Sequence, residues 1–133
     1  MLLDASALLA FLLKEEGGLE VLNVVSSRPC SISSVTLTEV QGKLVGRGDF
    51  TPRQVEAQLG PLLGFVREVP FDSACREKAS FYYAYYARKS PYGLSLGDAA
   101  CLGTAEALKL DVLTAEKGWS EIPDLPFQVH LTR

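Results

Sequence analysis

Short apolar runs alternate with segments of helical composition from one end of the chain to the other. Glycine pairs and prolines interrupt the pattern at most junctions, as they do between the elements of an α/β domain. Because strands that alternate with helices over short connections favour parallel pairing, the pattern predicts a three-layer α/β fold with a mostly parallel, roughly five-stranded sheet flanked by helices. The predicted strands are 1–3, 30–33, 65–71, 111–114 and 126–131.

The size and composition of the chain favour one compact domain. Its 133 residues are enough to bury a core without disulfides, and we expect a single domain over residues 1–133. The hydrophobic share of 47% and a mean hydropathy of +0.13 exceed those of a disordered chain. The same apolar bias suggests that a partner or a second copy covers part of the surface.

The cysteines and the amino-terminal segment indicate a cytoplasmic protein with no membrane association. Three cysteines, with no C-x-x-C pair, are typical of buried thiols in a reducing compartment. The opening MLLDASALLAFLL lacks a basic region, is interrupted by Asp4 and is too short to span a bilayer.

Four acidic residues stand where apolar runs end, and together they predict a metal site. In a wound α/β domain the carboxyl ends of the strands share one crevice, so carboxylates that are distant in sequence can meet there. A divalent cation would relieve their mutual repulsion, and oxygen-only ligands favour Mg²⁺ or Mn²⁺. The four are Asp4, Glu39, Asp98 and Glu116.

Each of these carboxylates also has a local structural interpretation as a helix cap. The segments 36–39 and 95–98 both fit the S/T-x-x-E/D capping box, Asp4 can cap the first helix, and Glu116 can complement a helix dipole. Taken singly, a cap is the better interpretation. Taken together, four helix-start carboxylates that point into one crevice favour a shared metal.

Three segments of the chain resemble the PIN-domain ribonucleases, and among them the VapC-type toxins of toxin–antitoxin pairs. Residues 94–119, LSLGDAACLGTAEALKLDVLTAEKGW, are similar to the family segment that carries the third and fourth acidic positions. Residues 2–17 resemble its first strand, with Asp4 and the hydroxyl of Ser6, and Glu39 in TLTEV matches the second acidic position.

This resemblance implies a fold, an activity and partners. It implies a PIN fold, Mg²⁺- or Mn²⁺-dependent cleavage of RNA by a metal-activated water, inhibition by a small antitoxin protein, and a homodimer. Asp4, Glu39 and Asp98 would hold the principal ion, Glu116 would assist, and Ser6 and Thr114 would support them. Glu116 departs from the family pattern, in which the fourth acidic residue is usually aspartate.

Aromatic and basic residues that precede the Asp98 segment supply candidates for RNA contact. Arg88 and Lys89 are the candidates for phosphate contact, against a net charge of −3 and a pI near 5.1 that argue against general nucleic-acid binding. An aromatic stripe favours core and dimer packing, with base stacking as the alternative; it consists of Phe81, Tyr82, Tyr85 and Tyr86, and Tyr83 lies off it.

Two other functions fit part of the pattern. A catalytically silent PIN-like module would bind RNA or a protein without cleavage, with Glu116 as the sign of a degraded site. An aspartyl phosphatase would need a second aspartate two residues after Asp4, where Ser6 stands. His130 in the last predicted strand is better explained as an edge residue than as a general base.

Overall fold

Five short strands form one parallel sheet in the computed structural model of the chain, which describes residues 1–87 and 90–133. Their order across the sheet is β3-β2-β1-β4-β5, and every neighbouring pair is parallel. The first strand therefore lies at the centre, and the chain winds outward from it in both directions. The strands are β1 (Leu2–Leu3), β2 (Cys30–Ser33), β3 (Val66–Val69), β4 (Val112–Thr114) and β5 (Val129–Leu131).

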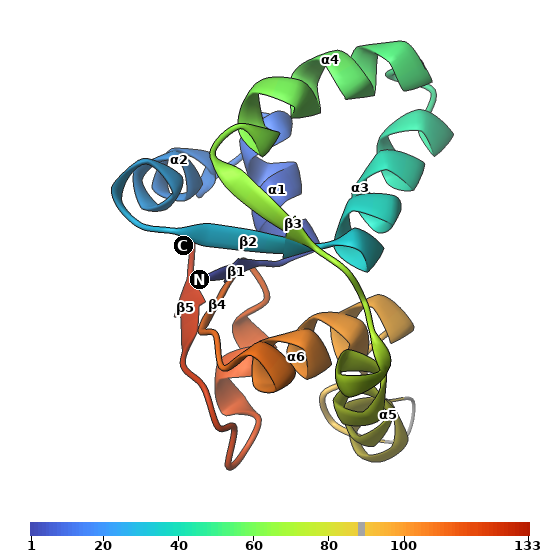
Figure 1. Ribbon diagram of the computed structural model, residues 1–133, viewed down its shortest axis with the longest axis vertical. Coiled ribbons are helices and arrows are strands. Elements are labelled where there is room, and N and C mark those ends of the chain that lie inside the picture. Colours follow the sequence, from blue (N-terminus) through green and yellow to red (C-terminus); the bar gives the residue numbers. More distant parts are fainter. Residues whose placement is uncertain (88–89) are drawn as a thin grey trace.

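Helices cover both faces of the sheet, which confirms the predicted three-layer α/β fold (Figure 1). One face carries α1 (Ala5–Leu12), α2 (Gly18–Ser27), α3 (Ser34–Gly46) and α4 (Pro52–Leu63). The other carries α5 (Ser73–Tyr86), α6 (Leu96–Leu108) and the 3₁₀ helix η1 (Lys117–Glu121).

Alternation along the central strands divides the apolar side chains between two cores. Leu3 and Leu113 pack with α1 to α4, whereas their neighbours Leu2 and Val112 pack with α6 and Trp119. Because successive strand residues point to opposite faces, a strand of only two residues can serve both layers. All of Leu2, Leu3, Val112 and Leu113 are almost completely buried.

Most of the helix starts follow the expected capping signals. Thr51 and Gln54 form a reciprocal capping box ahead of α4, with Pro52 in its first turn. Asp72 accepts a hydrogen bond from the amide of Cys75 at the start of α5. Ser95 and Asp98 form the second capping box, at the start of α6.

The prediction that segment 36–39 caps a helix is wrong. Strand β2 runs directly into α3, and the cap is Ser33, whose hydroxyl accepts a hydrogen bond of 3.1 Å from the amide of Val35. Thr36 and Glu39 therefore lie inside the helix. The expectation that all four acidic residues stand at helix starts consequently fails for Glu39.

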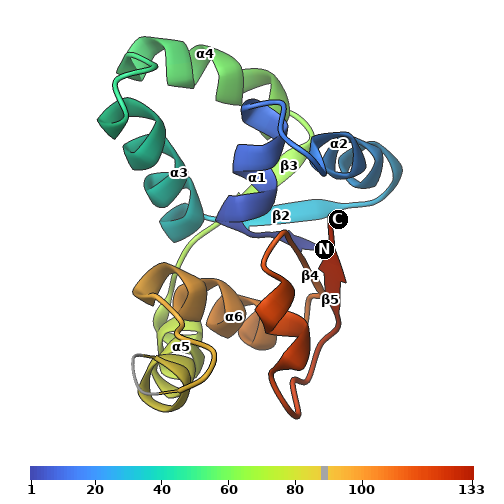
Figure 2. The same cartoon turned by 180° about the vertical axis from the view of Figure 1, so that it is seen from behind.

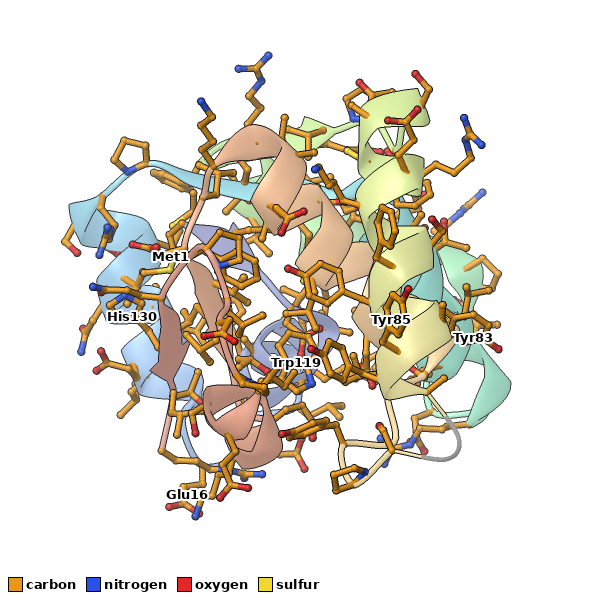
Figure 3. All side chains as sticks on the ribbon, turned by 90° about the horizontal axis from the view of Figure 1, so that it is seen from below. Met1, Glu16, Tyr83, Tyr85, Trp119 and His130 are labelled. Atoms are coloured by element: carbon orange, nitrogen blue, oxygen red, sulfur yellow. The ribbon has the colours of Figure 1, made fainter. Side chains whose placement is uncertain are left out.

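Helices α5 and α6 pack closely, and their aromatic residues divide between core and surface. A Cβ at Gly103 of α6 would overlap the backbone of Ala79 of α5, so glycine is needed where the two helices meet. Tyr82 is buried, but Phe81 and Tyr85 are 58% and 69% exposed. Tyr83 is also exposed, and Figure 3 shows Tyr83 and Tyr85 at different sides of α5. Packing thus explains only part of the predicted aromatic stripe.

The remaining general expectations concern thiols and membrane segments. Cys30, Cys75 and Cys101 are free and buried, as predicted. Across residues 1–87 and 90–133, no helix combines the length and the apolar character that crossing a bilayer requires.

Candidate metal centre

The four predicted carboxylates line one cavity of about 380 Å³. Asp4 directly follows β1, and Glu116 stands two residues after β4. Glu39 comes from α3, and Asp98 comes from the first turn of α6. Figure 2 shows the starts of α1 and α3 facing the first turns of α6, at this edge of the sheet. The fold thus brings the four acidic residues together as the sequence predicts. Ser6, Ser95, Lys43, Glu15 and Arg133 are among the other lining residues.

Asp4 is the buried centre of this cavity, with only 3% of its surface exposed. Its Oδ2 accepts hydrogen bonds from the hydroxyl of Ser6 at 2.7 Å, from the hydroxyl of Thr114 at 2.9 Å and from the amide of Ser6 at 3.3 Å. These three donors all use Oδ2, so Oδ1 is left for a ligand in the cavity. The predicted supporting residues Ser6 and Thr114 are therefore in direct contact with Asp4.

The same two hydroxyls anchor the segment that carries Glu116. Ser6 Oγ accepts a hydrogen bond of 2.9 Å from the amide of Ala115, and Thr114 Oγ1 accepts one of 3.0 Å from the amide of Glu116. Each hydroxyl thus contacts both Asp4 and a backbone amide, and the two hydroxyl oxygens lie 3.1 Å from each other. Asp4 and the backbone of Glu116 are held in one arrangement, although more than a hundred residues separate them.

Burial makes the charge on Asp4 costly in the absence of a cation. Desolvation raises the pKa of the Asp4 carboxyl from 3.8 to about 6, and the nearby charge of Asp98 acts in the same direction. The hydrogen bonds from Ser6 and Thr114 oppose this rise. A divalent ion bound in the cavity would favour the ionised form.

Glu39 spans the opposite side of the cavity, between α3 and α6. Its Oε2 forms an ion pair of 2.9 Å with Nζ of Lys43, one turn later on the same helix. Its Oε1 lies against Gly97, where a Cβ would overlap it. A glycine in the first turn of α6 therefore lets this carboxylate approach the helix backbone.

Asp98 and Glu116 complete the set with different local partners. Asp98 Oδ2 accepts a hydrogen bond of 3.0 Å from the amide of Ser95, and the amide of Asp98 donates to Ser95 Oγ at 3.1 Å. Glu116 precedes η1 without a side-chain cap, and its side chain is exposed. The cap interpretation thus holds for Asp98 and not for Glu116.

The donor set fits Mg²⁺ or Mn²⁺, although the carboxylates stand apart in this arrangement. All four predicted ligands are carboxylates, which suits a hard cation. Over residues 1–87 and 90–133, no three acidic, histidine or cysteine side chains lie close enough together to hold a metal as they stand. In this arrangement Oε2 of Glu39 is paired with Lys43, and Oδ2 of Asp98 accepts the hydrogen bond from the amide of Ser95.

The sequence analysis did not predict several residues that line the cavity. Lys43 was missed, and its signal is the four-residue spacing from Glu39, which places both side chains on one helix face. Glu15 and Arg133 also line the cavity, and neither carries a sequence pattern that predicts this. Arg88 and Lys89, the candidates for phosphate contact, lie outside the described residues.

The single histidine is remote from this chemistry. His130 lies in β5, with Nε2 3.9 Å from Oδ2 of Asp111, and it is not among the residues that line the cavity. Figure 3 shows it on the opposite side of the molecule from Tyr83 and Tyr85. This position agrees with the interpretation of His130 as an edge residue.

Comparison with known proteins gives one family match and several matching folds. The family model of the PIN domain matches residues 1–125. The VapBC complex of Salmonella typhimurium, solved bound to DNA, is similar over 99% of this chain and 97% of its own, at 22% identity and a TM-score of 0.73. A search of curated protein sequences gave no match.

Two further solved structures show the same fold. A toxin–antitoxin complex from Klebsiella pneumoniae is similar over 96% of this chain and 98% of its own, at 21% identity and a TM-score of 0.68. A VapC toxin from Mycobacterium tuberculosis, described as cleaving the sarcin–ricin loop, covers 84% of this chain and 85% of its own, at 16% identity and a TM-score of 0.63.

Proposed function

The chain belongs to the PIN-domain family, and from that premise we propose that it is a Mg²⁺- or Mn²⁺-dependent endoribonuclease, the toxin of a type II toxin–antitoxin pair. One observation carries this proposal: four carboxylates from four separate segments line a single cavity around the buried Asp4. So much negative charge, with one member buried, is costly unless a cation shares the site. An RNA phosphodiester is the substrate that such a cation can bind and activate.

In this proposal Asp4, Glu39 and Asp98 hold the principal ion, and Glu116 supports it from the exposed side. The ion would supply a Lewis acid that activates water and stabilises charge on the phosphate. Ser6 and Thr114 keep Asp4 Oδ2 occupied, so that Oδ1 faces the ligand. Glu39 and Asp98 give up Lys43 and the Ser95 amide when they bind.

The test is cleavage of a mixed pool of transfer and ribosomal RNA by the antitoxin-free protein, with Mg²⁺, Mn²⁺ or EDTA. We expect cuts that disappear in EDTA and in Asp98→Asn, where the amide can preserve the capping box. Asp111→Asn is the matched control, because Asp111 accepts a backbone hydrogen bond from Gln128 outside the cavity. Cleavage that survives in Asp98→Asn would contradict the proposal.

The silent binding module stays the alternative, and metal binding separates it from the nuclease. For the nuclease, Mn²⁺ should raise the melting temperature of the wild type, and Asp4→Asn should remove this effect. A folded wild-type protein that binds RNA without cleavage, and that Mn²⁺ does not stabilise, would favour the silent module.

The proposed antitoxin partner has a candidate docking surface next to the cavity. Two adjoining cavities of about 790 and 190 Å³ share Phe11 and Pro61, and they form an apolar groove between α2 and α4. Leu19 and Phe65 line this groove and are 79% and 73% exposed. Similar folds have been solved as toxin–antitoxin complexes, so we propose that an apolar segment of the antitoxin occupies the groove.

Co-expression with the neighbouring antitoxin gene and co-purification test this partner. Leu19→Ser combined with Phe65→Ser should weaken the complex, whereas Phe81→Ser on the other face of the sheet should not. A complex unaffected by the groove variants would place the partner elsewhere. The predicted homodimer is a separate proposal, which light scattering of the isolated protein tests; a monomer at high concentration would contradict it.

A further inference from the structure

Lys43 is a cation that α3 places among the carboxylates of the metal centre. We propose that Lys43 is a substrate-positioning residue, which holds Glu39 in the metal-free protein and contacts an RNA phosphate once a divalent ion has taken Glu39. This inference rests on the proposed nuclease function and assigns a role to a residue outside the acidic quartet. The position, charge and mobility of the Lys43 side chain all support this role.

The geometry places Lys43 at the mouth of the cavity. Its Nζ lies 2.9 Å from Oε2 of Glu39, and Lys43 lines the same cavity as the other three carboxylates. The Lys43 side chain is 56% exposed, whereas that of Glu39 is 27% exposed. The ammonium group is therefore both beside the acidic residues of the cavity and accessible to a phosphate from solvent.

Lys43 carries its positive charge beside Glu39, in a cavity that Asp4 and Asp98 also line. A divalent ion that binds these three carboxylates would repel the ammonium group and take its partner. The nearest new anion would be the phosphate that the ion itself attracts, and lysine binds phosphate as a compact point charge.

The length and exposure of the side chain permit this exchange of partners. An ion pair between residues four apart on a helix contributes little when one partner is exposed, as Lys43 is, so Lys43 can leave Glu39 at low cost. Lys78 gives a useful comparison, since it pairs with Glu106 at 3.6 Å and is similarly exposed at 48%. Lys78 does not line the cavity, so we expect no RNA phosphate to replace Glu106 as its partner.

The experiment measures single-stranded RNA binding by the full chain, with Ca²⁺ replacing Mg²⁺ to suppress turnover, for Lys43→Met, Lys43→Arg and Lys78→Met. We expect Lys43→Met to raise the Kd about tenfold and to reduce the slope of log Kd against log salt by about 0.7, the value for one lost phosphate contact on a single strand. Lys43→Arg should restore most of the affinity, and Lys78→Met should match the wild type.

A second readout separates phosphate contact from a role in holding the metal ligand. Calorimetry without RNA should show that Lys43→Met binds Mn²⁺ at least as tightly as the wild type, because a competing cation has been removed. Weaker Mn²⁺ binding by Lys43→Met, or an unchanged RNA Kd and salt slope, would overturn the proposal. Metal-dependent cleavage by the wild type is scored separately, so the nuclease function can stand when the role of Lys43 fails.

Discussion

The two walls of the acidic cavity are held in different ways. The fixed wall consists of Asp4, Ser6 and Thr114, which are joined by side-chain hydrogen bonds between the first and fourth strands. The exchangeable wall consists of Glu39 and Asp98, whose partners belong to their own helices. One wall is thus fixed by the complete fold, whereas the other is held by local partners that a bound ion could replace.

The difference follows from sequence separation and burial. Thr114 and Asp4 are 110 positions apart and lie in the core, so only the complete fold brings them together. Asp98 bonds a residue three positions away, and Glu39 bonds one four positions away. Local partners of half-exposed groups are exchanged at low cost, whereas a buried network is expensive to break. Only the fixed wall of the candidate metal centre is therefore preorganised.

The largest expected effect is a gain in metal-free stability from Asp4→Asn. The asparagine oxygen can accept the same hydrogen bonds, and the buried charge is removed. Raising a pKa from 3.8 to about 6 corresponds to about 3 kcal/mol at pH well above 6. Urea unfolding in EDTA at pH 8 should show this gain.

The sign of the pH dependence follows from the same shift. The folded protein binds a proton on Asp4 more tightly than the unfolded chain, so wild-type stability in EDTA should fall as pH rises from about 4 to about 6. The advantage of Asp4→Asn should shrink toward pH 4. Asp72→Asn is the control, since the pKa of Asp72 is lowered by its cap hydrogen bond to Cys75. An equal gain in that variant would show that the fixed wall is not special.

The next effect is a loss of stability in Thr114→Val, which keeps the shape of the side chain. Removing the hydroxyl takes one donor from Asp4 and leaves the Glu116 amide without its acceptor. We expect a cost of about 1–3 kcal/mol by chemical denaturation. Thr104→Val is the matched buried control, because the Thr104 hydroxyl donates to the carbonyl of Ala100 within α6 and makes no bond to Asp4. Similar costs in both variants would contradict the network.

A smaller effect on the exchangeable wall should come from Ser95→Ala. Loss of this cap should destabilise α6 by about 1 kcal/mol, as Thr51→Ala should do at the other capping box. Ser95→Ala removes the hydroxyl that accepts a hydrogen bond from the Asp98 amide, but it keeps the Ser95 amide that donates to Asp98 Oδ2. Mn²⁺ binding should therefore change by less than about twofold in both variants. A larger change in Ser95→Ala alone, measured by calorimetry, would show that the whole reciprocal cap restrains Asp98.

The smallest effect is expected at Glu116, whose side chain belongs to neither wall. Its amide is fixed by Thr114, but its carboxylate is exposed. Glu116→Asp, which restores the family's usual residue, should change the cleavage rate by only about two- to fivefold, or less than 1 kcal/mol. Glu116→Gln keeps the length without the charge and serves as the comparison in the same assay. A loss as large as that in Asp98→Asn would make Glu116 a principal ligand.

The sequence predicted the fold well because its helix-capping residues and its apolar alternation are distinctive. Pro52 after Thr51, Asp72 before a long helix, and the alternation through Leu2 and Leu3 each have one physical interpretation. The start of α3 was misplaced because several hydroxyl residues follow one another around the end of β2, and any of them can cap. Only the tertiary position of β2 selects Ser33.

The sequence predicted which acidic residues form the candidate site, but it did not predict their hydrogen bonds and ion pairs. Asp4, Asp98 and Glu116 follow strands or stand at a helix start, and this placement predicted that they share one crevice. The structure brings them together in one cavity. Glu39 joins them from the interior of α3, which no capping pattern describes. The ion pair with Lys43 depends on which helix face meets the cavity, and that orientation is set by packing.

The hydrogen bond between Thr114 and Asp4 also has a consequence for biosynthesis. The ribosome makes Thr114 110 residues after its partner Asp4. A nascent chain that stops before Thr114 can form α1 to α4, yet it cannot close the network that orients Asp4. Because contacts between distant parts of a chain form only after the intervening segment exists, the fold would delay the proposed nuclease activity until the ribosome has passed Thr114.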